Sequence, residues 1–225
     1  MTFSKTEAVL KRAMDVGLAG VGLAASLPLL AGVAAAVRIQ MGAPVMYRQV
    51  RVGLDKKQFR LWKFRTMTNE RSADGNLLPD GERLTALGRW LRETSLDELP
   101  QLINVLAGDM SIVGPRPLLV RYLPRYSPRQ QRRHTVRPGL TGWAQVHGRN
   151  SLDWDSRLEL DVWYAENASL LLDIRIILST VWMVLRREAV LSGAGAEMDE
   201  FWGTAGPPSG GPRAFPVEEI ESIPS

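Results

Sequence analysis

The chain has 225 residues, enough for one folded domain with short appendages, and it contains no cysteine. Disulfide bonds, thiolate catalysis and cysteine-ligated zinc are therefore excluded, and His134 and His147 alone are too few for a histidine-based metal site. The net charge of +4 combines +9 over residues 1–195 with −5 over residues 196–225. A body this basic favours an anionic partner: lipid headgroups, nucleic acid or a phosphorylated substrate.

The first expected element is an apolar helix over residues 16–37, a run of 22 residues without a charge. At about 1.5 Å per residue such a helix reaches roughly 33 Å, enough to cross a bilayer. Three interpretations compete: a signal peptide, a spanning helix, and a re-entrant hairpin that dips into one leaflet and returns. The run is longer than the apolar region of a signal peptide, which is usually about 7–15 residues.

The flanking charges and a central proline distinguish a spanning helix from a re-entrant hairpin. A spanning helix should be basic at its cytoplasmic end only, but this run is basic on both sides. The flanking bases are Lys5, Lys11, Arg12, Arg38, Arg48 and Arg51. Pro28 lies near the middle, where it removes a hydrogen bond and bends the helix, and Ser26 is placed to bond a freed carbonyl. We therefore predict a re-entrant membrane hairpin over residues 1–40.

Residues 41–202 are expected to form a cytoplasmic catalytic domain, so that the whole chain is mostly α with a small β-hairpin. The hairpin is predicted from strands at 45–52 and 58–67 around a turn, and residues 68–82 read as a polar loop. The expected helices cover residues 84–91, about 95–108, 158–167 and 170–187.

Two features mark the C-terminal part of the chain. Asp173 and Arg175 interrupt the last expected helix, which argues against a spanning helix and favours a core helix or an amphipathic helix at the membrane interface. Seven of the eleven residues 203–213 are glycine or proline, so residues 203–225 are predicted to be a disordered tail.

Adjacent carboxylates occur in the segment Ser-Leu-Asp-Glu-Leu-Pro-Gln over residues 95–101. In one interpretation this is only a helix start, because Ser95 and Glu98 fit a capping box. In the other, Asp97 and Glu98 are working carboxylates at a helix N-terminus, where the dipole favours anions. Such a pair can also hold Mg²⁺ beside a diphosphate. The two interpretations are compatible.

Single basic residues are scattered through apolar or turn-rich sequence around this pair. They are Lys63, Arg65, Arg92, Arg116 and Arg149. Arginine is the preferred bidentate partner of phosphate, and proline on both sides of Arg116 would rigidify its backbone. Each base alone is typical of a surface or salt-bridge residue, but beside two carboxylates they indicate a diphosphate site.

Five segments together resemble the small bacterial sugar transferases, also called monotopic phosphoglycosyl transferases. The segments are 63–67, 95–101, 108–117, 137–146 and 148–150, and their order and spacing match the family across about residues 8–190. Lys11, Arg12 and Asp15, followed by a proline-broken apolar helix, match as well. Two positions depart from the family pattern: Leu27 stands where serine often precedes the proline, and His147 stands where asparagine is common.

The resemblance implies a mechanism with named residues. Asp97 would attack the β-phosphate of a UDP-sugar and release UMP, Glu98 would assist through Mg²⁺, and polyprenol (undecaprenyl) phosphate would then take the sugar phosphate. Lys63, Arg65, Arg92, Arg116 and Arg149 fall where the family places groups that bind or support phosphate. The location implied is the inner leaflet of the bacterial plasma membrane, facing the cytoplasm, at the first membrane step of glycoconjugate or exopolysaccharide synthesis.

Two other functions compete with this one. A non-catalytic membrane adaptor of the same fold would not need the intact Asp97–Glu98 pair. A hydrolase of UDP-sugars would not need the N-terminal hairpin. No segment reads as a code for the sugar transferred.

Arginines recur every fourth residue from Arg121 to Arg137. A helical stripe that binds nucleic acid is one interpretation, but Pro124 and Pro128 disrupt a continuous helix there, and no nucleic-acid partner is expected. Contact with anionic lipid or substrate phosphates is favoured. His147 is interpreted as a supporting or surface residue, and not as a general base.

Overall fold

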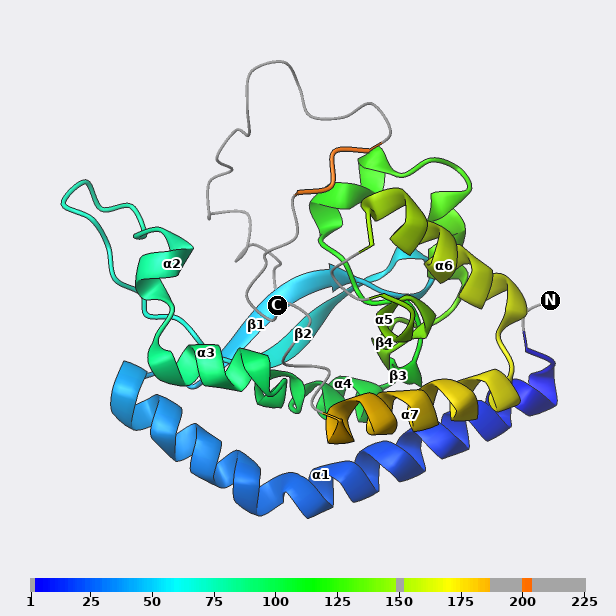
Figure 1. Cartoon of the computed structure of the whole chain (residues 1–225), viewed down its shortest axis with the longest axis horizontal. Helices are drawn as coiled ribbons and strands as arrows, with labels where there is room; N and C mark the ends of the chain where they lie inside the picture. The colour runs from blue at the N-terminus through cyan, green and yellow to red at the C-terminus, as the bar shows by residue number, and fades with distance from the viewer. Residues whose placement is uncertain (1–2, 149–151, 187–199, 204–225) are drawn as a thin grey trace.

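A computed structural model of the chain describes residues 3–148, 152–186 and 200–203. Helix α1 (Lys5–Met41) runs along one side of the molecule and is bent in its middle, while α3 (Ala86–Glu93), α4 (Gln101–Ala107) and α7 (Leu170–Leu185) lie along it (Figure 1). The two small sheets and α6 (Trp154–Asn167) lie on the far side of this helical layer. The predicted class, mostly helical with a small β-hairpin, is confirmed.

The hairpin forms as the alternating pattern predicts. Strand β1 (Met46–Val52) pairs antiparallel with β2 (Gln58–Phe64), with Met46 opposite Phe64 and Val52 opposite Gln58. Phe59 and Leu61 of β2 are buried in a core cluster that they share with α1 and α4. The hairpin is therefore fastened to α4, which follows the carboxylate pair.

Most predicted helices are confirmed with shifted ends. The expected helix at 84–91 is α3, capped by Thr85, whose side chain accepts from the amide of Gly88. The last two expected helices are α6 and α7. The helical elements not predicted are the short helices α2 (Asp80–Arg83) and α5 (Trp143–Val146), and the 3₁₀ helices Leu54–Lys56, Leu96–Glu98, Val120–Arg125 and Gln130–Thr135. The strands of a second sheet were not predicted either.

A second sheet joins two of the sequence motifs. Strand β3 (Ser111–Val113) pairs in parallel with β4 (Gly139–Thr141). The backbones approach so closely that a Cβ atom on Gly114 would lie 2.2 Å from the Arg137 carbonyl oxygen, and one on Gly139 would lie 2.0 Å from the Gly114 nitrogen. This contact explains Gly114 and Gly139, because any side chain at either position would separate the strands.

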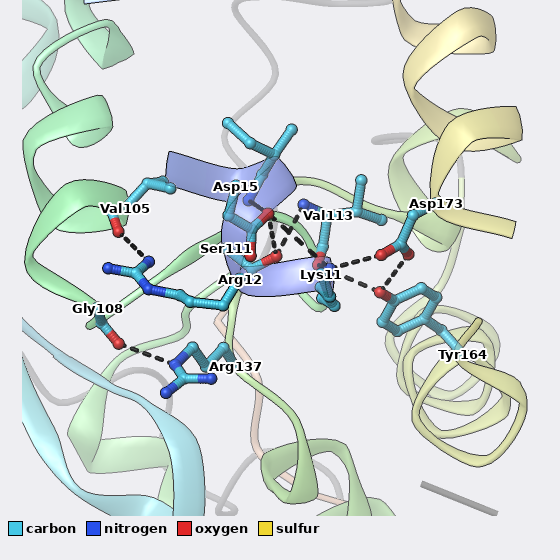
Figure 2. A network of polar contacts seen from close by, with 11 residues as sticks. Lys11, Arg12, Asp15, Val105, Gly108, Ser111, Val113, Arg137, Tyr164 and Asp173 are labelled. Carbon is cyan, nitrogen blue, oxygen red and sulfur yellow. Dashed lines mark hydrogen bonds and ion pairs between the residues drawn. The ribbon is translucent and has the colours of Figure 1, made fainter. Parts of the chain in front are cut away.

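Three charged residues near the start of α1 bind the rest of the protein (Figure 2). Lys11 Nζ lies 2.5 Å from Asp173 Oδ2 on α7, and the other Asp173 oxygen accepts from the Tyr164 hydroxyl at 2.6 Å. Asp15 Oδ1 accepts from the Ser111 hydroxyl at 2.9 Å. Arg12 donates to the carbonyls of Val105 and Leu106 at the end of α4, at 2.6 and 2.8 Å. Because every charge has a partner, α1 can bury this stretch against the domain.

The far end of α1 contacts the same domain. Val33 and Val37 pack with Phe64 of β2 and Leu91 of α3. The guanidinium of Arg65 donates to the Met41 carbonyl and, at 3.0 Å, to the Ala43 carbonyl. Both ends of α1 are therefore held by one body.

The middle of α1 carries the expected bend. Pro28 lies inside the helix, and the bend is visible between its two arms (Figure 1). The hydroxyl of Ser26 donates to the Leu23 carbonyl at 3.2 Å, and not to the Ala24 carbonyl that Pro28 leaves without its helical donor. The predicted bond from Ser26 to the freed carbonyl is therefore wrong. Within the described residues, α1 is the one helix long and apolar enough to cross a membrane.

Replacing Lys11 by methionine should destabilise the protein by about 3–5 kcal/mol, because the buried Asp173 carboxylate would lose its cation. Thermal unfolding of the purified chain in detergent measures the loss. The matched control is Arg129→Met, which breaks an ion pair with Glu159 in which both side chains are 53% exposed, and it should change little. Equal effects of the two changes would contradict a special role for the buried pair.

Candidate active site

The carboxylate pair lies in one turn of 3₁₀ helix, η2 (Leu96–Glu98), between α3 and α4. Ser95, which precedes the turn, adopts a φ of 57° and makes no side-chain capping hydrogen bond. The capping-box interpretation of Ser95 and Glu98 is therefore wrong. The helix expected to start near residues 95–97 begins there as a 3₁₀ turn, and not as the first turn of a continuous α-helix. Helix α4 begins only at Gln101, after Pro100, and the Glu98 side chain is engaged by cations from other elements.

Four predicted site residues are brought together from three parts of the chain. Glu98 Oε1 lies 2.6 Å from Lys63 Nζ, at the end of β2, and 2.6 Å from Arg116 Nη2. Arg116 Nη1 donates to the other Glu98 oxygen at 3.3 Å, which makes the contact bidentate. Lys63 Nζ also lies 3.7 Å from Asp97 Oδ2. Asp97 itself is 5% exposed.

The two carboxyl groups differ in their electrostatic surroundings. Burial raises the pKa of Asp97, Lys63 opposes this rise, and the neighbouring Glu98 adds to it. Burial would also raise the pKa of Glu98, but Arg116 and Lys63 together hold it well below its usual range. Glu98 is therefore a neutralised anion, and Asp97 is the carboxylate whose charge depends on Lys63.

Arg92 lies beside this group, and Arg65 does not contact it. Arg92 Nε donates to the Thr66 hydroxyl at 3.1 Å. Helix α3 can come this close because Gly88 has no side chain. A Cβ atom at this position would clash with the Thr66 carbonyl oxygen, at 1.8 Å. The guanidinium hydrogen bonds of Arg65 go to the end of α1, because β2 ends at Phe64 and the chain turns there. Arg149 lies outside the described residues.

Two further arginines hold the backbone at Arg116 and at the residue after it. Arg51 of β1 donates to the Pro117 carbonyl at 3.3 Å, and burial together with the nearby Arg116 charge lowers the pKa of Arg51 to about 10. Arg133 donates to the Arg116 carbonyl at 2.7 Å and forms a buried ion pair with Asp161 at 2.7 Å. Neither role was predicted, because Arg51 read as a flank of the apolar run and Arg133 as one member of the arginine repeat.

The arginine repeat does not form a helical stripe. Arg121 and Arg125 lie in the 3₁₀ helix η3 (Val120–Arg125), Arg133 lies in η4 (Gln130–Thr135), and the other two members lie outside both. The members bind partners within the protein: Arg121 and Arg125 bind Glu200, Arg129 binds Glu159, Arg133 binds Asp161, and Arg137 binds the Gly108 carbonyl. The adjacent Arg132 binds Glu166. Six arginines share four carboxylates, because Arg121 and Arg125 both bind Glu200 and Arg137 binds a neutral carbonyl. The favoured interpretation, contact with lipid or substrate phosphates, stays a prediction.

The predicted Mg²⁺ site requires free oxygen ligands. Asp97 and Glu98 supply carboxylate oxygens, the ligands that Mg²⁺ prefers. Both oxygens of Glu98, however, accept from Lys63 or Arg116. Among the described residues there is no group of three or more His, Cys, Asp or Glu side chains that could hold a metal ion. A divalent ion would thus need oxygen ligands beyond these two side chains.

Residues 6–187 match the bacterial sugar transferase family. The uncharacterized sugar transferase EpsL of Bacillus subtilis (strain 168) is 50% identical over 196 residues, 87% of this chain and 97% of that protein. The UDP-glucose:undecaprenyl-phosphate glucose-1-phosphate transferase of Escherichia coli (strain K12) is 43% identical over 187 residues, 77% of this chain and 40% of that protein. The UDP-N-acetylgalactosamine-undecaprenyl-phosphate N-acetylgalactosaminephosphotransferase of Aeromonas hydrophila is 39% identical over 197 residues, 84% of this chain and 45% of that protein.

The chain belongs to the bacterial sugar transferase family. The prediction drawn from the five motifs is confirmed, and with it the prediction that the protein is an enzyme. The chain spans nearly the whole length of the B. subtilis relative and less than half the length of the other two.

Replacing Lys63 by methionine should raise the pKa of the Asp97 carboxyl further, because the cation that opposes the effect of burial is removed. The titration can be followed by ¹³C NMR of chains labelled at aspartate, with Asp97→Asn identifying the signal. Lys57→Met removes an exposed lysine from the turn of the same hairpin and should leave the titration unchanged. If Lys63→Met does not move the midpoint upward, Lys63 does not control the charge of Asp97.

Proposed function

We propose that this enzyme transfers a sugar 1-phosphate from a UDP-sugar to undecaprenyl phosphate and releases UMP. The observation that carries the proposal is the buried carboxylate of Asp97 beside Glu98, whose charge Lys63 and Arg116 neutralise. The same reaction is supported by the E. coli and A. hydrophila relatives, whose names specify sugar-phosphate transfer to undecaprenyl phosphate.

In the first step, a carboxylate oxygen of Asp97 forms a bond to the β-phosphorus of the donor. The bond from that phosphorus to the oxygen bridging the two phosphates breaks, and UMP leaves with this oxygen and the bonding electrons. The sugar phosphate remains on Asp97 as an acyl phosphate. Lys63 and Arg116 are placed to balance the charge that otherwise separates an anionic nucleophile from a diphosphate.

In the second step, a phosphate oxygen of undecaprenyl phosphate attacks the same phosphorus. The bond to Asp97 breaks, the carboxylate is regenerated, and the product is a lipid-linked diphosphate sugar. The donor is soluble and the acceptor is held in the membrane, so a covalent intermediate lets one site use them in turn.

The proposal includes Mg²⁺ as cofactor, held by Asp97 and Glu98 together with phosphate oxygens of the donor. Since Glu98 is engaged by two cations, Lys63 or Arg116 would move onto the diphosphate when the ion binds. The bound ion would supply positive charge beside the phosphates that react. Arg92 lies next to this group and is assigned to phosphate binding.

The same proposal places the enzyme on the cytoplasmic face of the bacterial plasma membrane, with α1 as a re-entrant hairpin in the inner leaflet. Support comes from the two ends of α1, since Lys11 and Arg12 at one end and Met41 at the other contact the same domain. A straight spanning helix would put its ends on opposite sides of the bilayer.

Helix α7 is assigned to the membrane interface. Its charged Asp173 points inward to Lys11, and apolar side chains cover its outer face. These exposed residues are Leu171, Ile174, Leu178, Val181, Trp182, Val184 and Leu185. A helix with a mainly apolar outer face, interrupted by the exposed Arg175, and with its acidic charge buried suits an interface between protein and lipid.

The two rival functions account for less of the site. An adaptor without catalysis leaves unexplained why Asp97 is buried beside a neutralised glutamate. A UDP-sugar hydrolase leaves unexplained the apolar surfaces of α1 and α7. Neither alternative forms a lipid-linked sugar, so detection of this product distinguishes a transferase from both.

Incubation with a UDP-sugar and Mg²⁺, without lipid, should add one sugar phosphate to the peptide that contains Asp97, as measured by mass spectrometry. UMP should appear in the same amount, and undecaprenyl phosphate should remove the adduct and yield lipid product. The matched variants are Asp97→Asn, which should lose the adduct and nearly all turnover, and Asp109→Asn, which should keep both. A chelator should abolish the adduct. Rapid lipid product without any adduct would contradict the two-step mechanism.

The topology is tested with single cysteines in this cysteine-free chain. Lys5→Cys and Lys57→Cys should both react with an impermeant thiol reagent in inverted membrane vesicles. Neither should react in spheroplasts, because both sites are expected on the cytoplasmic side. Ala25→Cys, near the bend, should be protected by lipid in both preparations. Reaction of Lys5→Cys in spheroplasts alone would indicate a spanning helix.

A further inference from the structure

A short segment near the C-terminus, residues 200–202, packs on the domain although it lies beyond the family match, which ends at residue 187. We call this segment the clasp. Phe201 is 2% exposed and is buried in a cluster with Leu118, Tyr122 and Tyr126. Its ring stacks on Tyr126, with centroids 5.3 Å apart, and meets Tyr122 edge-on at 5.7 Å. An aromatic side chain buried this fully, outside the part of the chain that matches the family, is a specific contact.

Charged groups fix the direction of the clasp. The Glu200 carboxylate lies 2.9 Å from Arg125 Nη1 and 3.4 Å from Arg121 Nε, both on η3. The Arg125 guanidinium also donates to the Phe201 carbonyl and lies over the Trp202 ring, 4.3 Å from its centroid. One arginine thus contacts three successive residues of the clasp.

One residue that packs against Phe201 lies close along the chain to the active site. Leu118, which packs in the cluster of Phe201, follows Arg116 by two residues. Its carbonyl accepts from the Val52 amide of β1 at 3.2 Å. The residues around Phe201 are thus two positions along the backbone from the arginine that binds Glu98.

We propose that the surface formed by Leu118, Tyr122, Tyr126, Arg121 and Arg125 is a binding site for an acidic–aromatic peptide, and that the chain's own clasp is its occupant. The aromatic walls accept Phe201, and the two arginines select an acidic residue directly before it. Occupancy orders η3 and the segment that carries Arg116. The effect on turnover rests on the function proposed above, whereas peptide binding does not.

Hydrogen exchange tests the clasp without reference to activity. The Tyr122 amide donates to the Leu119 carbonyl at 3.0 Å, so it reports the order of η3. A chain ending at Asp199 should exchange this amide about tenfold or more faster than the full chain, because the opening of η3 no longer has to expose Phe201. A chain ending at Gly203 should match the full chain. Equal exchange in the two truncated chains would overturn the proposal.

A point variant removes the aromatic anchor without shortening the chain. Phe201→Ala should reproduce the faster exchange, and the matched control Phe215→Ala should not. If Phe201→Ala leaves the Tyr122 amide fully protected, the clasp does not order η3.

Binding in trans tests the site itself. A fluorescent peptide of residues 198–203 should bind the chain that ends at Asp199, and should bind the full chain at least about tenfold more weakly because the site is filled. The same peptide with alanine for Phe201 should not bind. Equal binding to both chains would show that the clasp is not the occupant.

Activity supplies the last arm. UMP release should fall in the chain ending at Asp199 and return when the peptide is added. An inactive full chain would count against the proposed function, and the exchange and peptide results would still decide on the clasp.

Discussion

The buried pairing of Lys11 with Asp173 joins the first part of α1 to the rest of the protein. An apolar helix suited to lipid has few ways to bind a polar domain firmly, and buried charges are stable only when paired and hydrogen-bonded. Lys11, Arg12 and Asp15 meet this condition by contacting α7, α4 and β3 (Figure 2). The helices that carry the site are consequently arranged along α1 (Figure 1).

The same rule operates in the active site with a different result. Glu98 is paired with two cations, and Asp97, one residue earlier, is buried with a single weaker contact to Lys63. Adjacent carboxylates thereby acquire different roles, as environments that separate two pKa values commonly allow. The strands and loops that supply Lys63 and Arg116 are held in place by residues that do not face the carboxylates, among them Arg133 with Asp161.

The predictions that succeeded came from local patterns. The hairpin followed from alternation, α6 and α7 from helical spacing, and the bend of α1 from Pro28. Motif spacing led to Asp97, Glu98, Lys63 and Arg116, and the structure brings these four together. Predictions of side-chain partners failed where several hydrogen-bonding groups from other elements lie within reach. Glu98 binds cations instead of capping a helix, and Arg65 binds the end of α1, because its strand stops one residue earlier.

The sequence by itself determined the hairpin, the longer helices, the family and the carboxylate pair, because periodicity, breakers and motif spacing are local properties of the chain. Only the tertiary structure decided which arginines face the site, that β3 pairs with β4, and that both ends of α1 bind one body. It also decided that residues 200–202 return to the domain. These contacts join residues far apart along the chain. They depend on which buried charge or carbonyl is nearest in space, and no local pattern records that distance.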